Sequence, residues 1–254
     1  MPFALVAVLI ACGSPDRVIV AVGTTLEDSG ILSELVAEYE AARPVQISVI
    51  GESTQRVLDL GRRGAAEVLI THAPAAEEAF VAAGAASSRE PFAASRFVLV
   101  GPPARIAALA DMTPEAAFAH IAAAQWAFVT RADGSGTEAA ERSIWAAVGI
   151  TPGGSWYQAT GLGMGDTLQV ADQREALTLA EEGTFVSVSG ALTIVAAELL
   201  DSDLLMNPYH VMVVAGASTE ARAFADWLVS PEGRQALRRA NDSIFGEQVF
   251  APTS

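Results

Sequence analysis

The sequence predicts an α/β protein with two lobes, each a mixed sheet flanked by helices, and a ligand cleft between the lobes. Short β-type runs alternate with amphipathic helical runs along the 254 residues, a pattern typical of sheets covered by helices. Two apolar strand-like segments, 97–100 and 211–215, bracket the middle third of the chain. Several turns carry Gly, Ser or Thr where a helix begins. Together these features favour two lobes that close on a small ligand.

The first residues predict an export segment. Residues 2–11 form an apolar run that is shorter than the ~20 residues of a membrane helix and has the length of a signal-peptide core. Residues 9–12, Leu-Ile-Ala-Cys, resemble the lipobox of bacterial lipoproteins, in which Cys12 is acylated. No Lys or Arg precedes Cys12, so the alternative is a buried strand with a small apolar Cys. We expect residues 1–16 to be a signal peptide, lipobox and tether, which places the protein in the periplasm or outside the cytoplasm.

The next segment contains two hydroxyl-bearing turns. We expect strands at 17–22, 45–50 and 66–70, with helices at 31–42 and 55–62 between them. Thr24 and Thr25 follow the first strand, and Ser53 and Thr54 follow the second. Ligands of parallel sheets bind beyond the carboxyl ends of the strands, so these four side chains should meet at one edge. The alternative is that each only caps a helix.

The rest of the chain predicts the second lobe and a return to the first. The expected elements are helices at 114–124, 138–148, 168–181, 193–200, 221–228 and 231–239, and strands at 97–100, 126–130, 183–188 and 211–215. We therefore assign 17–97 plus 211–254 to lobe I and 98–210 to lobe II.

Residues 131–137, Arg-Ala-Asp-Gly-Ser-Gly-Thr, form the most informative turn. It follows a strand and leads into a helix, whose first N–H groups have no partner within the helix. Ser135, Gly136 and Thr137 add hydroxyl and amide donors to Arg131, which suits a tetrahedral oxyanion. The alternative is a plain helix cap at Ser135. A second Gly-rich turn at 161–167 adds Gly165 as a weaker candidate.

Composition excludes several other functions. The net charge of −15 argues against nucleic acid and anionic membrane surfaces as partners. One cysteine and three scattered histidines give neither an intrachain disulfide nor metal-site spacing. Ser135 and His120 could suggest a nucleophile pair, but no nucleophile-elbow motif surrounds Ser135, so we expect no enzyme activity.

Several blocks together resemble the solute-binding proteins of tungstate ABC transporters, which have the two-lobed type II periplasmic-binding-protein fold. The blocks keep their order and spacing over residues 17–250. They are residues 23–30, 58–70, 72–78, 97–102, 131–137, 156–165, 207–209 and 227–233.

This resemblance implies an extracytoplasmic protein that captures tungstate or molybdate and delivers it to an ABC permease. It implies no catalysis and no cofactor, and we expect a monomer that touches the membrane only through a lipid anchor. The ligand residues it implies are Thr24, Thr25, Thr54, Arg131, Ser135, Gly136 and Thr137. The chain departs from the family pattern at Val22, Gly23 and Leu26, where Thr is usual, at Ser53, where Gly is usual, and at Asp166, where a small neutral residue is usual.

Two alternatives stay open at this point. Residues 131–137 also resemble the anion loop of phosphate-binding proteins, in which a carboxylate takes the proton of hydrogen phosphate. Asp133 could play that part, but we favour an orienting role beside Arg131, because an unpaired carboxylate facing a dianion is costly in a dry cleft. The altered first turn would also fit a sensory or interaction protein that keeps the fold but not transport.

Overall fold

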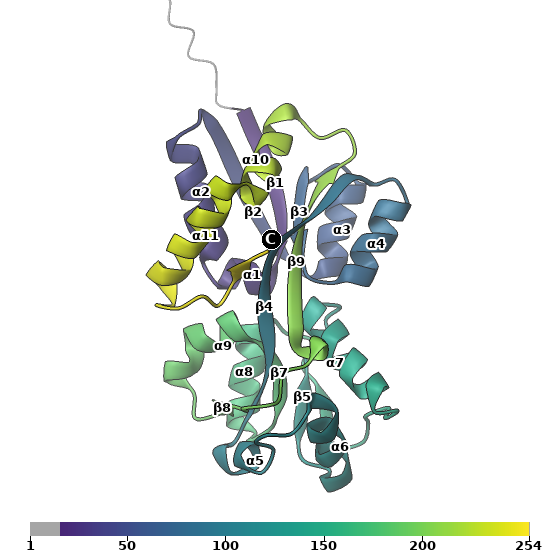
Figure 1. The fold of residues 1–254 in the computed structure, drawn as a ribbon. Helices are drawn as coiled ribbons and strands as arrows, with labels where there is room; N and C mark the ends of the chain where they lie inside the picture. The colour runs from purple at the N-terminus through teal and green to yellow at the C-terminus, as the bar shows by residue number, and fades with distance from the viewer. Residues whose placement is uncertain (1–15, 254) are drawn as a thin grey trace, which may run out of the picture.

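The computed structural model describes residues 16–253, which form two lobes joined by two long strands (Figure 1). Lobe I, at the top of Figure 1, contains elements from both ends of the described chain, and lobe II contains the middle. This is the two-lobed α/β fold that the sequence predicts. The lipobox and Cys12 lie outside the described residues, and no helix among residues 16–253 is long and apolar enough to span a membrane.

The sheet of lobe I is mixed. Its strand order is β10-β4-β9-β3-β1-β2, in which β1 pairs in parallel with β2 and β3, and β9 pairs antiparallel with β3 and β4. The strands are β1 (Asp16–Gly23), β2 (Val45–Glu52), β3 (Val68–Thr71), β4 (Ala86–Gly101), β9 (Met206–Val214) and β10 (Ala251–Pro252).

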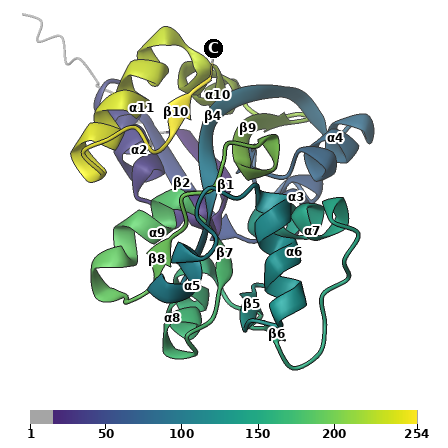
Figure 2. The same ribbon diagram turned by 60° about the horizontal axis from the view of Figure 1, so that its bottom comes forward.

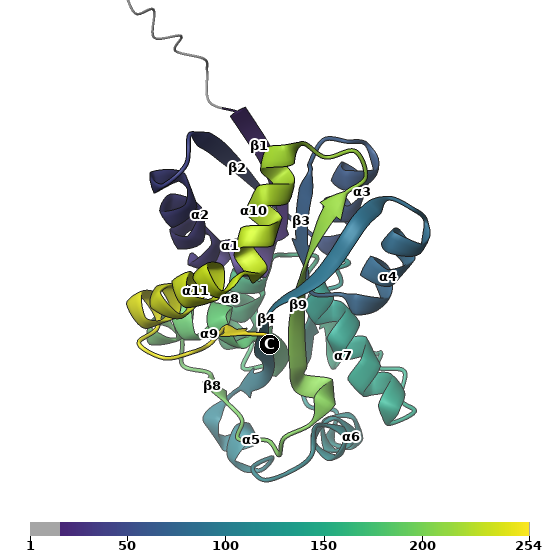
Figure 3. The same cartoon turned by 45° about the horizontal axis from the view of Figure 1, so that its top comes forward.

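Helices cover both faces of this sheet. One face packs against α2 (Ile31–Ala41), α10 (Thr219–Val229) and α11 (Pro231–Ile244), and the other against α3 (Thr54–Arg62) and α4 (Pro74–Ala82), as Figure 3 shows. The short helix α1 (Thr24–Asp28) follows β1 directly. Buried aliphatic side chains of β1 and β3 fill the space between sheet and helices, which fixes the orientation of the strand ends.

Strands β4 and β9 carry the chain between the lobes. Up to Arg96, β4 pairs with β9 in lobe I; from Phe97 to Gly101 it pairs with β7 (Thr178–Glu181) and β8 (Val195–Ala196) of lobe II. The sequence predicts only the end of this strand, because its first part is interrupted by charged residues and Pro91. The lobe boundaries at 97/98 and 210/211 stay a prediction.

Lobe II has a smaller sheet between two layers of helices. Strand β5 (Phe128–Thr130) pairs in parallel with β6 (Tyr157–Ala159) and is bridged to Leu177, next to β7. Phe118 of α6 (Pro114–Ala124) and Trp145 of α7 (Gly136–Ala147) pack on one side. Leu168 of α8 (Met164–Gln173) packs on the other, followed by α9 (Glu182–Val188); α5 (Pro103–Ala107) lies at the end of the lobe (Figure 1).

Three predicted elements of lobe II are wrong. The helix expected over 168–181 ends at Gln173, and its last four residues form β7, buried on both faces, where periodicity cannot separate helix from strand. The strand expected over 183–188 is α9, because the Glu181 side chain accepts a hydrogen bond from the Thr184 N–H and starts a helix. The helix expected over 193–200 contains β8 instead, since Asp172 holds the backbone N–H groups of residues 193 and 194.

Candidate anion-binding site

Three strands of lobe I end at the same edge of the sheet. Gly23, the last residue of β1, pairs with Glu52, the last of β2, and Val22 pairs with Ile70 near the end of β3. The residues that follow, among them Thr24, Ser53 and His72, therefore leave the sheet together. The sequence predicts this meeting for the hydroxyl residues but gives His72 no role.

Residues 131–137 of lobe II, the predicted anion turn, have the geometry expected where a helix begins. Ser135 caps α7, with its Oγ accepting from the Glu138 N–H at 3.3 Å. Gly134 has φ +75°, and its N–H donates to the Glu138 carboxylate at 2.6 Å. The cap is therefore present, and the predicted anion contact stays compatible with it, because capping uses the Ser135 oxygen as acceptor and leaves its hydroxyl hydrogen free to donate.

Arg131 is the buried cation of this turn. Only 2% of its surface is exposed. Its Nη2 donates to Asp133 Oδ2 at 2.6 Å and, across the gap between the lobes, to Thr24 Oγ1 at 3.4 Å. Asp133 Oδ1 accepts from the Ser135 N–H at 3.1 Å. Asp133 therefore pairs with Arg131 through one oxygen and with the backbone of the turn through the other, which are the contacts that an orienting role requires.

Four buried donor atoms on predicted site residues have no hydrogen-bond partner among the described residues. They are Nε and Nη1 of Arg131, Oγ1 of Thr54 and Oγ1 of Thr137. A buried polar group without a partner costs about 1–3 kcal/mol, and a charged one costs more. Guanidinium nitrogens can only donate, and both hydroxyls can donate. A multivalent anion is the ligand that would satisfy all of them at once.

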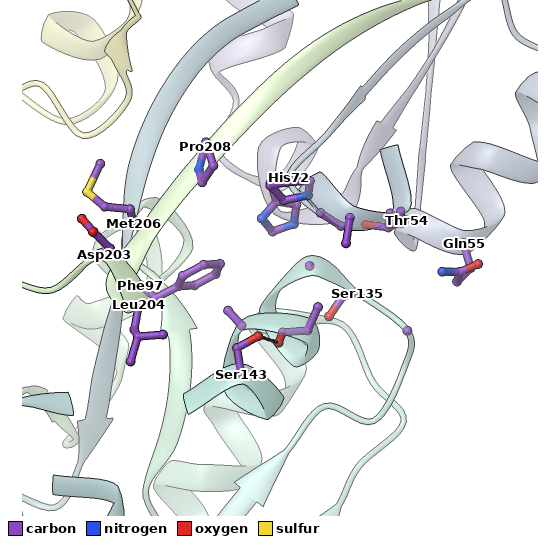
Figure 4. A pocket seen from close by; sticks show the side chains of 18 residues that line it. Thr54, Gln55, His72, Phe97, Ser135, Ser143, Asp203, Leu204, Met206 and Pro208 are labelled. Carbon is purple, nitrogen blue, oxygen red and sulfur yellow. Dashed lines mark hydrogen bonds between the residues drawn. The ribbon is translucent and has the colours of Figure 1, made fainter. Parts of the chain in front are cut away.

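A cavity of about 520 Å³ opens between the lobes, and of these donor residues Thr54 lines it (Figure 4). Thr54 and His72 line it from lobe I, and Ser135 and Gly136 line it from lobe II. Both lobes contribute to the lining because α7 of lobe II lies next to α3 of lobe I, as Figures 1 and 2 show. The end of the cavity away from Thr54 and Ser135 is apolar, and Phe97 is among the residues that line it.

His72 is fixed at the polar end of this cavity. Its Nδ1 lies 2.6 Å from Asn207 Oδ1, and its ring stacks on Tyr209 at 4.8 Å between centroids. Burial lowers the His72 pKa to about 4, against the opposing effect of the Asn207 hydrogen bond, so the ring is neutral at pH 7. A Cβ on Gly136 would lie 2.6 Å from His72 Nε2, so glycine is needed where the lobes meet.

The remaining predicted residues lie at the margin of the site. Ser53 is the half-buried N-cap residue of α3, and its side chain makes no capping bond. Gly165 lines a second cavity of about 320 Å³ together with Asp28 and Asp166, rather than the cavity of Ser135 and Gly136. Burial raises the pKa of Asp28, Arg131 opposes this, and the charge of Asp166 adds to it. The structure therefore places Gly165 beside an acidic pair.

Two of the departures from the family pattern fall outside the site. Val22 and Leu26 are fully buried in the apolar core of lobe I. Hydroxyl groups at these positions would point into that core. The replacements therefore remove no donor from the cavity between the lobes.

The described residues contain no group of three or more His, Cys, Asp or Glu side chains that could hold a metal ion.

Residues 11–232 match the PBP superfamily domain. The chain belongs to the PBP superfamily. Its two-lobed α/β fold agrees with this membership.

Within this superfamily the chain is similar to ABC-transporter binding proteins. It is 33% identical to the tungstate-binding protein TupA of Peptoclostridium acidaminophilum, over 93% of this chain and 86% of that protein. It is 35% identical to a putative ABC transporter anion-binding protein of Haloferax volcanii, over 95% of this chain and 73% of that protein. Among solved structures, the tungstate ABC transporter protein of Geobacter sulfurreducens matches with a TM-score of 0.80 and 32% identity, over 89% of this chain and 99% of that chain.

Proposed function

We propose that this chain captures tungstate, or molybdate, outside the cytoplasm and delivers it to the permease of an ABC transporter. The observation that carries the proposal is the set of four buried donor atoms without partners on Arg131, Thr54 and Thr137. The names of the similar proteins support the same ligand and the same kind of transporter. The site offers donors for a dianion, and the similar proteins are named as binding proteins, so we propose binding without catalysis or a cofactor.

The same geometry argues against phosphate. Near neutral pH hydrogen phosphate carries a proton and needs an acceptor, whereas tungstate and molybdate are fully ionised. The carboxylate that could accept that proton, Asp133, already accepts from Arg131 and from the Ser135 N–H. A carboxylate has about four acceptor sites, so we base the expectation of weak phosphate binding on direction instead: both Asp133 oxygens are turned towards Arg131 and the backbone of the turn.

The apolar N-terminal segment and the acidic surface support the remaining parts of the proposal. We propose an exported protein, anchored through acylated Cys12, that works as a monomer. With a net charge of −15, it would not be held to anionic lipid by charge.

Calorimetric titration of residues 14–254 with tungstate, molybdate, sulfate and phosphate tests the proposal. We expect tight binding of tungstate or molybdate, and complete loss in Arg131→Ala, because that change removes the buried cation. Arg239→Ala is the control: Arg239 lies on α11 of lobe I, about half of its side chain is exposed, and its ion pair is with Glu38, away from the cavity. If none of the four anions binds, the result would contradict the proposal and favour a sensory role. Wild-type affinity in Arg131→Ala would remove Arg131 from the site.

A further inference from the structure

A chain of buried hydrogen bonds runs behind the anion site at the point where β4 and β9 pass between the lobes. Asn207 is its centre. The Asn207 Nδ2 donates to Ser95 Oγ at 2.9 Å and to Tyr209 Oη at 3.1 Å, while its Oδ1 lies 2.6 Å from His72 Nδ1. Ser95 in turn donates to Glu181 of lobe II at 2.7 Å. All of these side chains are buried.

The amide of Asn207 sets the direction of every bond around it. Since Oδ1 can only accept, His72 carries its proton on Nδ1, and the neutral ring leaves a lone pair on Nε2. Since Nδ2 can only donate, Tyr209 Oη accepts from it and has its own hydrogen to give elsewhere.

Asn207 and Thr25 are the hydrogen-bond partners of Tyr209 among the described residues, so we assign Thr25 as the acceptor of that hydrogen. The Thr25 Oγ1 lies 3.3 Å from Tyr209 Oη and 3.5 Å from His72 Nε2. Once Thr25 accepts from Tyr209, its own hydroxyl hydrogen must point away from Tyr209. Among these contacts its acceptor is His72 Nε2, at the upper limit of a hydrogen-bond distance.

We propose that Tyr209 and Asn207 are positioning residues of the anion site, which fix the Thr25 hydroxyl as a donor to the bound oxyanion. The proposal rests on the proposed function. Thr25 adjoins Thr24, the lobe I contact of Arg131, and His72 Nε2 lies against Gly136 of the anion turn. The weak bond to His72 is easily exchanged for a shorter bond to an anionic oxygen.

A double-mutant cycle on tungstate affinity tests this proposal. Tyr209→Phe removes the hydroxyl and keeps the ring on His72; Thr25→Val removes the donor and keeps the side-chain shape. We expect Tyr209→Phe to weaken tungstate binding about 3- to 10-fold, the range of one neutral hydrogen bond. Thr25→Val should weaken it at least about 10-fold, because it removes a donor to an anionic oxygen. The double variant should bind no more weakly than Thr25→Val alone, because Tyr209 acts only through Thr25. Tyr39→Phe, a buried tyrosine in the helical layer of lobe I, is the matched control and should bind like the wild type.

Two further variants secure the result. Thr25→Ser keeps a hydroxyl, so it should bind near the wild-type level and lose affinity when Tyr209→Phe is added. Asn207→Asp gives Tyr209 a new acceptor and should weaken binding as Tyr209→Phe does. Losses that multiply in the double variant, or wild-type affinity in Tyr209→Phe, would overturn the proposal while leaving the proposed function intact. A wild-type protein that does not bind tungstate would overturn both.

Discussion

At Gly136 a single residue decides how closely the lobes approach each other. It is the first residue of α7, and its Cα faces the edge of the His72 ring. That ring cannot move aside freely, because Asn207 holds one side of it and Tyr209 stacks on its face. An added methyl group would therefore push the lobes apart or tilt the ring.

We expect Gly136→Ala to weaken tungstate binding at least about 10-fold, since a Cβ 2.6 Å from His72 Nε2 is not tolerated without movement. Gly165→Ala is the control, because a Cβ there meets nothing within 4 Å and the backbone N–H is kept. Calorimetric titration of both variants checks the prediction. Equal affinities in the two variants would contradict it.

Residue chemistry in the site is more predictable from sequence than residue contacts. Arg131, Ser135 and Thr137 can be recognised because a donor-rich turn before a helix has a local signature. His72 cannot, because its role comes from Asn207, 135 positions away in the chain. A histidine directly after a buried strand was the only local signal, and that position is also common for a histidine that only packs.

Helix α7 is the element that joins the anion turn to the interior of lobe II. Its first turn carries the donors, and one turn further on it buries Glu141, which accepts from Trp145 Nε1 at 3.0 Å and Tyr157 Oη at 2.6 Å. Burial raises the Glu141 pKa to about 7, and these hydrogen bonds only partly oppose it. The helix therefore contains a carboxyl group that titrates near neutral pH.

The sign of the resulting pH effect follows from the two states. The folded protein keeps the Glu141 proton up to about pH 7, whereas the unfolded chain releases it near 4.5. The free energy of unfolding should therefore fall as pH rises through this window, by about 3 kcal/mol in total. Glu141→Gln should remove that part of the slope, as measured by urea unfolding at pH 5 and pH 8. Glu78→Gln, an exposed change in α4, should keep it, and equal slopes in both variants would contradict the assignment.

The local sequence pattern predicts the helices and strands of lobe I well, and those of lobe II less accurately. In lobe I the alternation of strands and amphipathic helices gives nearly correct bounds for β1, α2 and α3. Near β7 the chain is buried throughout, so the spacing of apolar residues no longer distinguishes a helix from a strand. Just before β8, a side chain distant in the sequence determines the backbone structure: Asp172 accepts hydrogen bonds from the N–H groups of residues 193 and 194.

At the scale of the whole molecule, an acidic protein must hold a dianion with local donors. The net charge of −15 repels a dianion at a distance, and salt screens this repulsion. Two carboxylates add a closer contribution, since Asp28 of lobe I and Asp166 of lobe II line one cavity between the lobes. Each raises the cost of bringing the lobes together around an anion, and Arg131 offsets part of this cost for Asp28.

Net charge and local charge can be separated by two variants that each remove one negative charge. Asp166→Asn acts at the cavity between the lobes, and Glu247→Gln acts on an exposed residue near the C-terminus. If local repulsion dominates, Asp166→Asn should tighten tungstate binding about 2- to 5-fold in low salt, and the gain should shrink in high salt, while Glu247→Gln stays close to the wild type. Titrations at two salt concentrations decide between the two. Equal gains in both variants would mean that the total charge governs binding, and no gain in either would mean that the Arg131 site already offsets the acidic pair.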